Sequence, residues 1–168
     1  MFFGQFPVAA IEVEGQLINY PDIFRRVAVN KFFKNSTYID TYTVQDGEKP
    51  EHIAYRLYDN AQYHWIVILA NNITNIQKEW PRSHQDLIAM CKDKYGADQV
   101  YGVHHYAFKA DPTVQTDYDQ AKVASGEIIP VNNYDYEHRL NDDKAEIQLL
   151  KPEYVQQFIG QFKQLIKK

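Results

Sequence analysis

The sequence predicts an α+β protein, in which short strands and helices occupy separate stretches of the chain. One observation is a row of β-branched and aromatic residues at 38–44 that ends at Asp46-Gly47. Another is a series of helix start and stop signals between 50 and 70. The last is a short strand candidate at 146–150, followed by an amphipathic C-terminal segment. We expect these elements to build one small core.

Length and composition are typical of a folded protein of ordinary domain size. The chain has 168 residues, 45% of them hydrophobic and 24% charged, with a formal net charge of −4. This balance argues against global disorder, and the negative charge disfavours nucleic-acid binding. The N-terminus lacks the features of a signal peptide, so we expect a protein that is made and used without export. The longest apolar run, 65–70, is far shorter than the roughly 18 residues of a membrane span, so no membrane insertion is expected.

The first stretch of the chain predicts an extended arm. Glycines and prolines separate its apolar clusters, and no helical period is sustained over 1–20. Aromatic rings in such an arm need cover, either from the arm's own domain or from another subunit. The candidate interface residues here are Phe2, Phe3 and Phe6.

A basic segment follows at 22–34, with four Lys or Arg residues against one acid. This modest excess is more typical of a solvated or partner-facing segment than of a nucleic-acid site. Phe24, Arg25 and Arg26 are further candidates for subunit contacts, because arginine pairs well with carboxylates across an interface. A solvated arginine pair is an equally open alternative.

The strand at 38–44 is followed by a helix from Pro50, because proline suits the first helical position. Apolar residues then follow at one-face spacing, and Asp59-Asn60 can end the helix. In 61–70 the run is apolar all round, so its period does not separate a buried helix from a buried strand. Asn60 as N-cap and Asn71-Asn72 as a stop favour a helix.

Farther along, Ser83 and Gly96 predict the start and end of another helix, which contains Cys91 on its apolar side. The segment 100–108 alternates as a strand does, whereas 111–130, with its glycine and prolines, predicts a long surface excursion. The C-terminal stripe after Pro152 predicts a helix whose apolar side is core or, alternatively, docks a partner.

The motifs of catalysis are missing. GxSxG, GxxxxGK[ST], GxGxxG and HExxH do not occur in the sequence. The adjacent His104 and His105 lie on a predicted strand, where their rings should point to opposite faces and prevent simple chelation. A lone Cys91 in a helix behaves as a small hydrophobe, and it cannot form an internal disulfide. We therefore expect no enzyme, no catalytic residue, no cofactor and no metal.

Two sets of residues carry a resemblance to known families. The segment 42–58 is similar to the opening of a LysM module: a strand, a glycine-centred turn and a helix with an Ile-Ala pair. The extension 58–65, together with Asp22-Ile23-Phe24-Arg25 upstream, resembles the LysM-containing baseplate wedge subunit of contractile-tailed phages, as in the T-even group. Segments downstream are also similar to that family, namely 80–83, 94–95, 133–142 and 150–154.

The resemblance implies a domain organisation. It comprises an extended arm and basic segment at 1–36 and a single LysM-like α+β domain at 37–168, with an insertion at about 71–145. On this hypothesis the strand at 38–44 pairs with the distant strand at 146–150. The residues expected in the small LysM-like core are Ile53, Leu57, Trp65 and Leu69.

The family also implies a function. Its members are structural parts of the tail baseplate, so the expected partners are other wedge proteins, with copies of the chain in neighbouring wedges as further candidates. The expected location is the virion, after assembly in the host cytoplasm. The alternative is a LysM-type module that binds peptidoglycan at the host cell wall. In this chain, however, the short loop that such a module uses beside its turn is replaced by the insertion.

Overall fold

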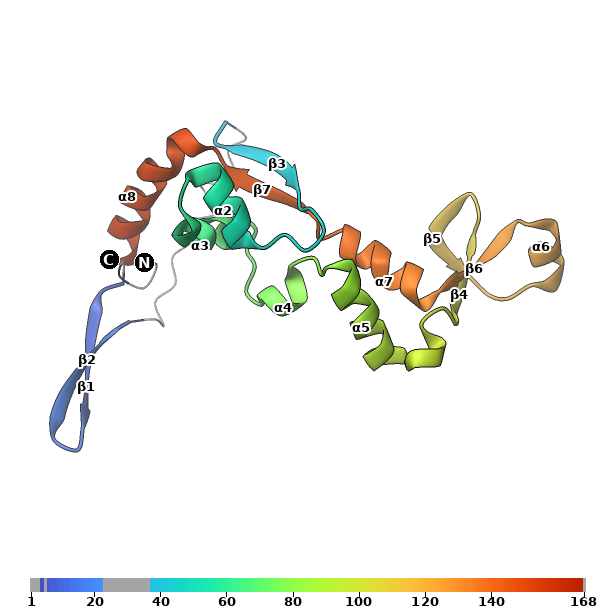
Figure 1. Cartoon of the computed structure of the whole chain (residues 1–168), viewed down its shortest axis with the longest axis horizontal. Helices are drawn as coiled ribbons and strands as arrows, with labels where there is room; N and C mark the ends of the chain where they lie inside the picture. Colours follow the sequence, from blue (N-terminus) through green and yellow to red (C-terminus); the bar gives the residue numbers. More distant parts are fainter. Residues whose placement is uncertain (1–3, 5, 23–36, 168) are drawn as a thin grey trace. The chain divides into compact units, whose positions relative to one another are not determined.

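The computed structural model describes residues 4, 6–22 and 37–167, and it divides the chain into two compact units (Figure 1). The first unit comprises Met1–Thr43, Glu48–Glu79 and Ile147–Lys168. The second comprises Val44–Gly47 and Trp80–Glu146, and it overlaps most of the predicted insertion. The turn 44–47 therefore belongs to the second unit, although the strand before it and the helix after it belong to the first.

Helices and small sheets make up both units, which confirms the predicted α+β class. The first unit contains β1 (Val8–Val13), β2 (Gln16–Pro21), β3 (Ile39–Thr43), α2 (Pro50–Tyr58), α3 (His64–Ala70), α4 (Ile76–Glu79), α8 (Val155–Ile166) and all of β7 (Glu146–Leu150) except its first residue. The second contains α5 (His84–Tyr95), β4 (Val103–Phe108), β5 (Asp111–Thr116), α6 (Gln120–Ser125), β6 (Ile128–Asn132) and α7 (Asn133–Asp142). Short 3-10 helices are η2 (Ala61–Tyr63), η3 (Ala97–Gln99) and η4 (Pro152–Tyr154).

The predicted pairing of two strands distant in sequence is confirmed. β3 and β7 form a two-stranded sheet. The Lys151 N–H, just after β7, donates to the carbonyl of Tyr38, just before β3, over 2.9 Å, so the strands run antiparallel. On β7, the Asn71 side chain acts as a further partner: its amide donates to the Gln148 carbonyl at 2.9 Å and accepts from the Gln148 N–H at 2.8 Å. The end of α3 is thereby tied to the closing strand.

The helices after β3 follow from local signals in the sequence. Pro50 occupies the start of α2, and the Lys49 N–H donates to Nδ1 of His52 over 3.3 Å. The helix ends where Asp59 takes a left-handed conformation with φ 54°. The next segment is helical, as expected from Asn60, whose side chain accepts from the Gln62 N–H at 2.9 Å. Three successive residues of α3, Trp65 to Val67, are buried. This burial on several sides of the helix explains why the sequence of α3 shows no polar face.

The core of the first unit lies between α3, the end of β7 and α8. The Trp65 ring lies 5.8 Å from that of Phe158 and 5.0 Å from that of Phe162, measured between ring centroids. The predicted core residue Ile53 is fully buried, whereas Leu57 and Leu69 are half-buried. The apolar stripe of α8 is core except for Leu165, which is 45% exposed.

In the second unit, the predicted surface excursion at 111–130 is mostly exposed but has regular structure. This segment forms β5, α6 and the start of β6, and the sheet has the order β5-β4-β6. Pro112 and Pro130 are tolerated because they lie on the two edge strands, where a missing N–H need not break the ladder. Gly126, with φ 74°, caps α6 and does not mark an irregular loop.

Over the described part of the chain, no helix combines the length and the apolar character that a membrane span requires.

Candidate functional site

The turn after β3 is held within the second unit. The carboxylate of Asp46 accepts a hydrogen bond from the His84 N–H, the first of helix α5, over 2.7 Å. Gly47 has φ 70°, a left-handed conformation that glycine adopts at little cost. The Val44 N–H donates to the Ala145 carbonyl at 2.8 Å, and the Val44 side chain is buried. A sugar-binding turn would offer polar groups such as the Asp46 carboxylate to its ligand. Here this carboxylate is used to position α5.

Beside this turn lies a small cavity of about 250 Å³. Many of the polar groups around it already have partners. The His84 ring shares a hydrogen bond of 2.8 Å with the Tyr134 hydroxyl, and Nδ1 of His138 lies 2.8 Å from the Asp142 carboxylate. Ligand pockets usually measure about 300–1,000 Å³, so this cavity is below the size of a typical ligand site. The lining residues are Val44, Gln45, Asp46, Pro81, Arg82, His84, Leu87, His138, Asn141, Asp142 and Ala145.

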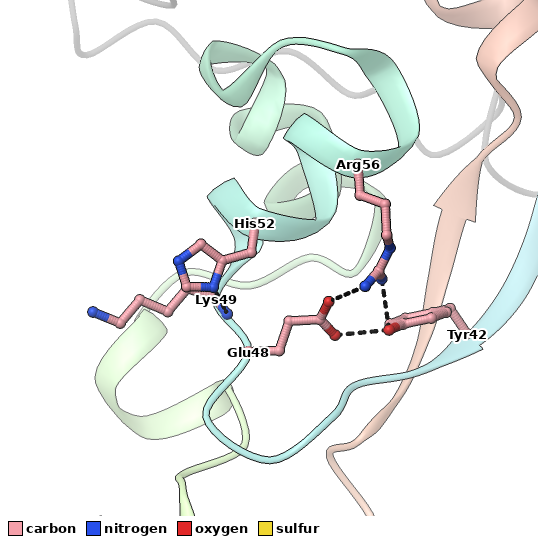
Figure 2. A network of polar contacts seen from close by, with 5 residues as sticks. All are labelled: Tyr42, Glu48, Lys49, His52 and Arg56. Atoms are coloured by element: carbon pink, nitrogen blue, oxygen red, sulfur yellow. Dashed lines mark hydrogen bonds and ion pairs between the residues drawn. The ribbon is translucent and has the colours of Figure 1, made fainter.

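Three side chains of the first unit form a closed polar network between β3 and α2 (Figure 2). The Tyr42 hydroxyl donates to Glu48 at 2.8 Å and accepts from Arg56 at 2.6 Å. The guanidinium of Arg56 also lies 2.7 Å from the Glu48 carboxylate, whose side chain is 8% exposed. Burial and the hydrogen bond with Glu48 raise the pKa of Tyr42, so the hydroxyl stays protonated. The network joins the strand to the helix.

The adjacent histidines of β4 contradict the prediction that their rings point to opposite faces. Nδ1 of His104 and Nδ1 of His105 are 2.8 Å apart, and the ring centroids are separated by 5.1 Å. The reason is a bulge: the register between β4 and β6 shifts between Val103 and His105, which interrupts the alternation of side chains. The His104 ring also stacks on Tyr136 of α7, with centroids 4.0 Å apart. Burial lowers the pKa of His105, and the neighbouring His104 and Arg139 add to this shift.

Next to this cluster, α5 and α7 are joined by a buried carboxylate. Glu137, 8% exposed, accepts from the Lys94 ammonium at 2.6 Å and from the Tyr95 hydroxyl at 2.7 Å. Burial alone would raise the pKa of Glu137, but these two donors outweigh it and hold the pKa below its usual value. These two hydrogen bonds to Glu137 stabilise the packing of α5 against α7.

Further candidate sites in the described part of the chain are the cysteine and the metal-ligating residue types. Cys91 is buried, and burial raises the pKa of its thiol, which disfavours the reactive thiolate. In the described ranges, no three His, Cys, Asp or Glu side chains come together in a group that could hold a metal ion.

The candidate interface residues fall in two groups. Phe6 is half-buried, and its ring meets Phe162 of α8 edge-on with the centroids 6.4 Å apart. The ring thus finds part of its cover in its own unit. The others lie outside the described residues, and they are Phe2, Phe3, Phe24, Arg25 and Arg26.

An exposed apolar surface on the β1–β2 hairpin was not predicted as such. Val8 and Leu17 are 72% and 75% exposed, and Ile11 and Ile18 about half exposed, at 50% and 49%. The signal that could have revealed the hairpin is the alternation on both sides of Glu14-Gly15, where both residues have positive φ.

Comparison with known proteins identifies the family. No curated protein matches the chain. The sequence model of one protein family, described as "Base plate wedge protein 53", matches residues 1–108. This match confirms the resemblance to a phage baseplate wedge subunit. Since it spans more than half of the chain, the protein belongs to the base plate wedge protein 53 family and has a structural role in the phage tail baseplate.

Proposed function

We propose that the chain binds other wedge proteins and links adjacent wedges while the baseplate assembles in the host cytoplasm, and that it does so without catalysis. The family match over residues 1–108 is the observation that carries this proposal. The matched range includes the hairpin β1–β2, whose apolar side chains are exposed in the isolated chain. Exposed apolar surface of this kind is typical of a subunit that acts in contact with neighbours.

We further infer that β3, α2, α3 and β7 form a LysM-like module that serves as a docking scaffold. The order strand, helix, helix, strand and the pairing of β3 with β7 support this inference. The hydrogen bond that Asp46 accepts from the His84 N–H argues against the glycan-binding alternative, because this carboxylate already has a partner in the chain itself.

Co-expression with the wedge proteins of the same phage genome tests the proposed function. We expect the chain to co-migrate with at least one of them in size-exclusion chromatography, because a wedge component must have stable neighbours. An unrelated protein of similar size serves as the control for incidental co-migration. If every component elutes separately across a range of salt concentrations, the proposal fails.

A pull-down on purified peptidoglycan tests the alternative. We expect no more of the chain to sediment with the cell wall than of a control protein with the same net charge. Retention that soluble glycan fragments compete away would favour a glycan-binding function over a purely structural one.

A further inference from the structure

The hairpin formed by β1 and β2 is a sheet of only two strands. Its register pairs Val13 with Gln16 and Ile11 with Ile18, and the turn residues Glu14 and Gly15 have φ 52° and 79°. Positive φ at both positions is the geometry of a tight type I′ turn, which fixes the register. Within the described residues, no further strand pairs with this sheet. A two-stranded hairpin is only marginally stable in water by itself, so an additional strand would stabilise it.

One face of the hairpin is almost entirely apolar. Because side chains alternate along a strand, the register places Ile11, Val13 and Ile18 on the same face. These three side chains are between 44% and 50% exposed. Ala9 and Tyr20, a facing pair, extend this face toward the base of the hairpin. An added strand with apolar residues in register would bury part of it through cross-strand contacts.

The two edges of the hairpin differ in their capacity to accept a strand. The Asp22 N–H donates to the Pro7 carbonyl at 2.8 Å, which fixes the alternation of inward and outward backbone groups along the hairpin. Counting along β1 from Pro7, the N–H groups that point away from β2 belong to Val8, Ala10 and Glu12. On β2 the corresponding positions are Leu17, Asn19 and Pro21, and proline has no N–H. The β1 edge is therefore the more complete template for strand addition.

The charge of the hairpin indicates what kind of strand fits. Glu12 and Glu14 are the charged residues of 8–21, both acidic, and the first basic residue of the chain is Arg25. A second copy of the hairpin would offer no cation to Glu12, because 8–21 contains no lysine or arginine. A strand that carries lysine or arginine opposite Glu12 would form a favourable cross-strand pair.

We propose that the outer edge of β1 takes up an extended segment of another baseplate protein as a third strand. That segment carries apolar side chains in register with Ile11 and Val13, and a lysine or arginine opposite Glu12. Main-chain hydrogen bonds to Val8, Ala10 and Glu12 hold it, as in other cases of strand addition. This inference rests on the proposed function, because it requires a baseplate partner.

Two proline variants of one facing pair test the edge. Ala10 and Asn19 face each other, and the N–H of each points outward, so proline at either site leaves the ladder between β1 and β2 in place. The probe is each wedge protein that co-migrates with the unaltered chain, purified and titrated against it. We expect Ala10→Pro to weaken binding at least tenfold and Asn19→Pro to change it less than threefold. Equal binding by both variants, or equal loss in both, would overturn the proposal.

A charge variant provides a test that does not depend on strand geometry. Glu12→Lys should weaken binding of the same partner several-fold and remove part of its salt dependence, whereas Glu153→Lys, on an exposed residue of η4, should leave both unchanged. Unaltered binding by Glu12→Lys would contradict the predicted basic partner.

Two further measurements separate the remaining explanations: the oligomeric state of the chain alone, and the binding of wedge proteins by the unaltered chain. A concentration-dependent dimer of the chain alone that Ala10→Pro abolishes would overturn the proposal in favour of a second copy as the added strand. If the unaltered chain binds no wedge protein, the proposed function itself fails. If it binds and Ala10→Pro binds equally well, only the strand addition is refuted.

Discussion

Replacing Trp65 with alanine should lower the free energy of unfolding of the first unit by about 3 to 5 kcal/mol. The Trp65 side chain is 6% exposed, and it packs against Phe158 and Phe162 of α8. Its removal opens a cavity between α3 and α8 and forfeits the ring contacts, and neither helix can close the gap without disturbing the other. Chemical denaturation followed by far-UV circular dichroism measures the loss, and hydrogen exchange of the α3 and α8 peptides localises it.

A matched control separates core packing from the general effect of losing a ring. Tyr55 of α2 is 64% exposed, so Tyr55→Ala should cost less than about 1 kcal/mol. The second tryptophan, Trp80, lies in the second unit, and its fluorescence reports whether that unit still folds when Trp65 is absent. A Trp65→Ala protein as stable as the control would mean that the ring contributes mainly to contacts with other subunits.

Elements whose ends carry their own chemistry could be predicted from the sequence. Helix α2 begins at Pro50, because proline fixes the first turn, and it ends at Asp59, which adopts a left-handed conformation. Helix α5 begins after Ser83, whose side chain accepts a hydrogen bond from the Asp86 N–H. The pairing of β3 with β7 was predicted only through the resemblance to a known family. Periodicity within each strand contains no information about a partner so distant in the chain.

The missed elements have physical reasons of another kind. Helix α7 is strongly polar, so no apolar stripe marks it; its signal is Asn132, whose side chain accepts from the Asp135 N–H at 2.7 Å. In the preceding segment, the prolines hid the strands, because the tolerance of proline on edge strands depends on strand order, which is a property of the whole sheet.

The candidate site residues show the same limit. His104 and His105 come together because a bulge in β4 cancels the alternation assumed for a regular strand. A bulge is set by the pairing of β4 with β6 and leaves no local mark in the two histidines. The exposed face of the β1–β2 hairpin was equally hidden, since apolar alternation alone does not show whether a face is covered.

Replacing Lys94 with methionine should destabilise the second unit by about 1 to 2 kcal/mol at neutral pH. Glu137 would keep its buried position and the hydrogen bond from Tyr95 but lose its charged donor, and a buried acceptor deprived of a partner costs about 1 to 3 kcal/mol. The lower part of that range applies because the Lys94 side chain is 52% exposed, so solvent screens the ion pair. Lys92→Met, on an exposed position of the same helix, is the control and should have little effect.

The pH dependence of this loss identifies Glu137 as its cause. A carboxyl whose pKa is lower in the folded than in the unfolded state stabilises the fold above the unfolded value, ordinarily 4.5 for this group, and the contribution fades as the pH falls through the folded pKa. Without Lys94 the pKa of Glu137 should rise, because its largest favourable donor is gone while burial remains. The stability gap between the unaltered chain and Lys94→Met should therefore be widest at neutral pH and close as the pH falls through the lowered pKa that Glu137 has in the folded, unaltered chain. A gap that stayed constant from pH 7 to pH 3, measured by denaturation and by hydrogen exchange of the α5 and α7 peptides, would mean that the lysine acts through its methylene packing and not through its charge.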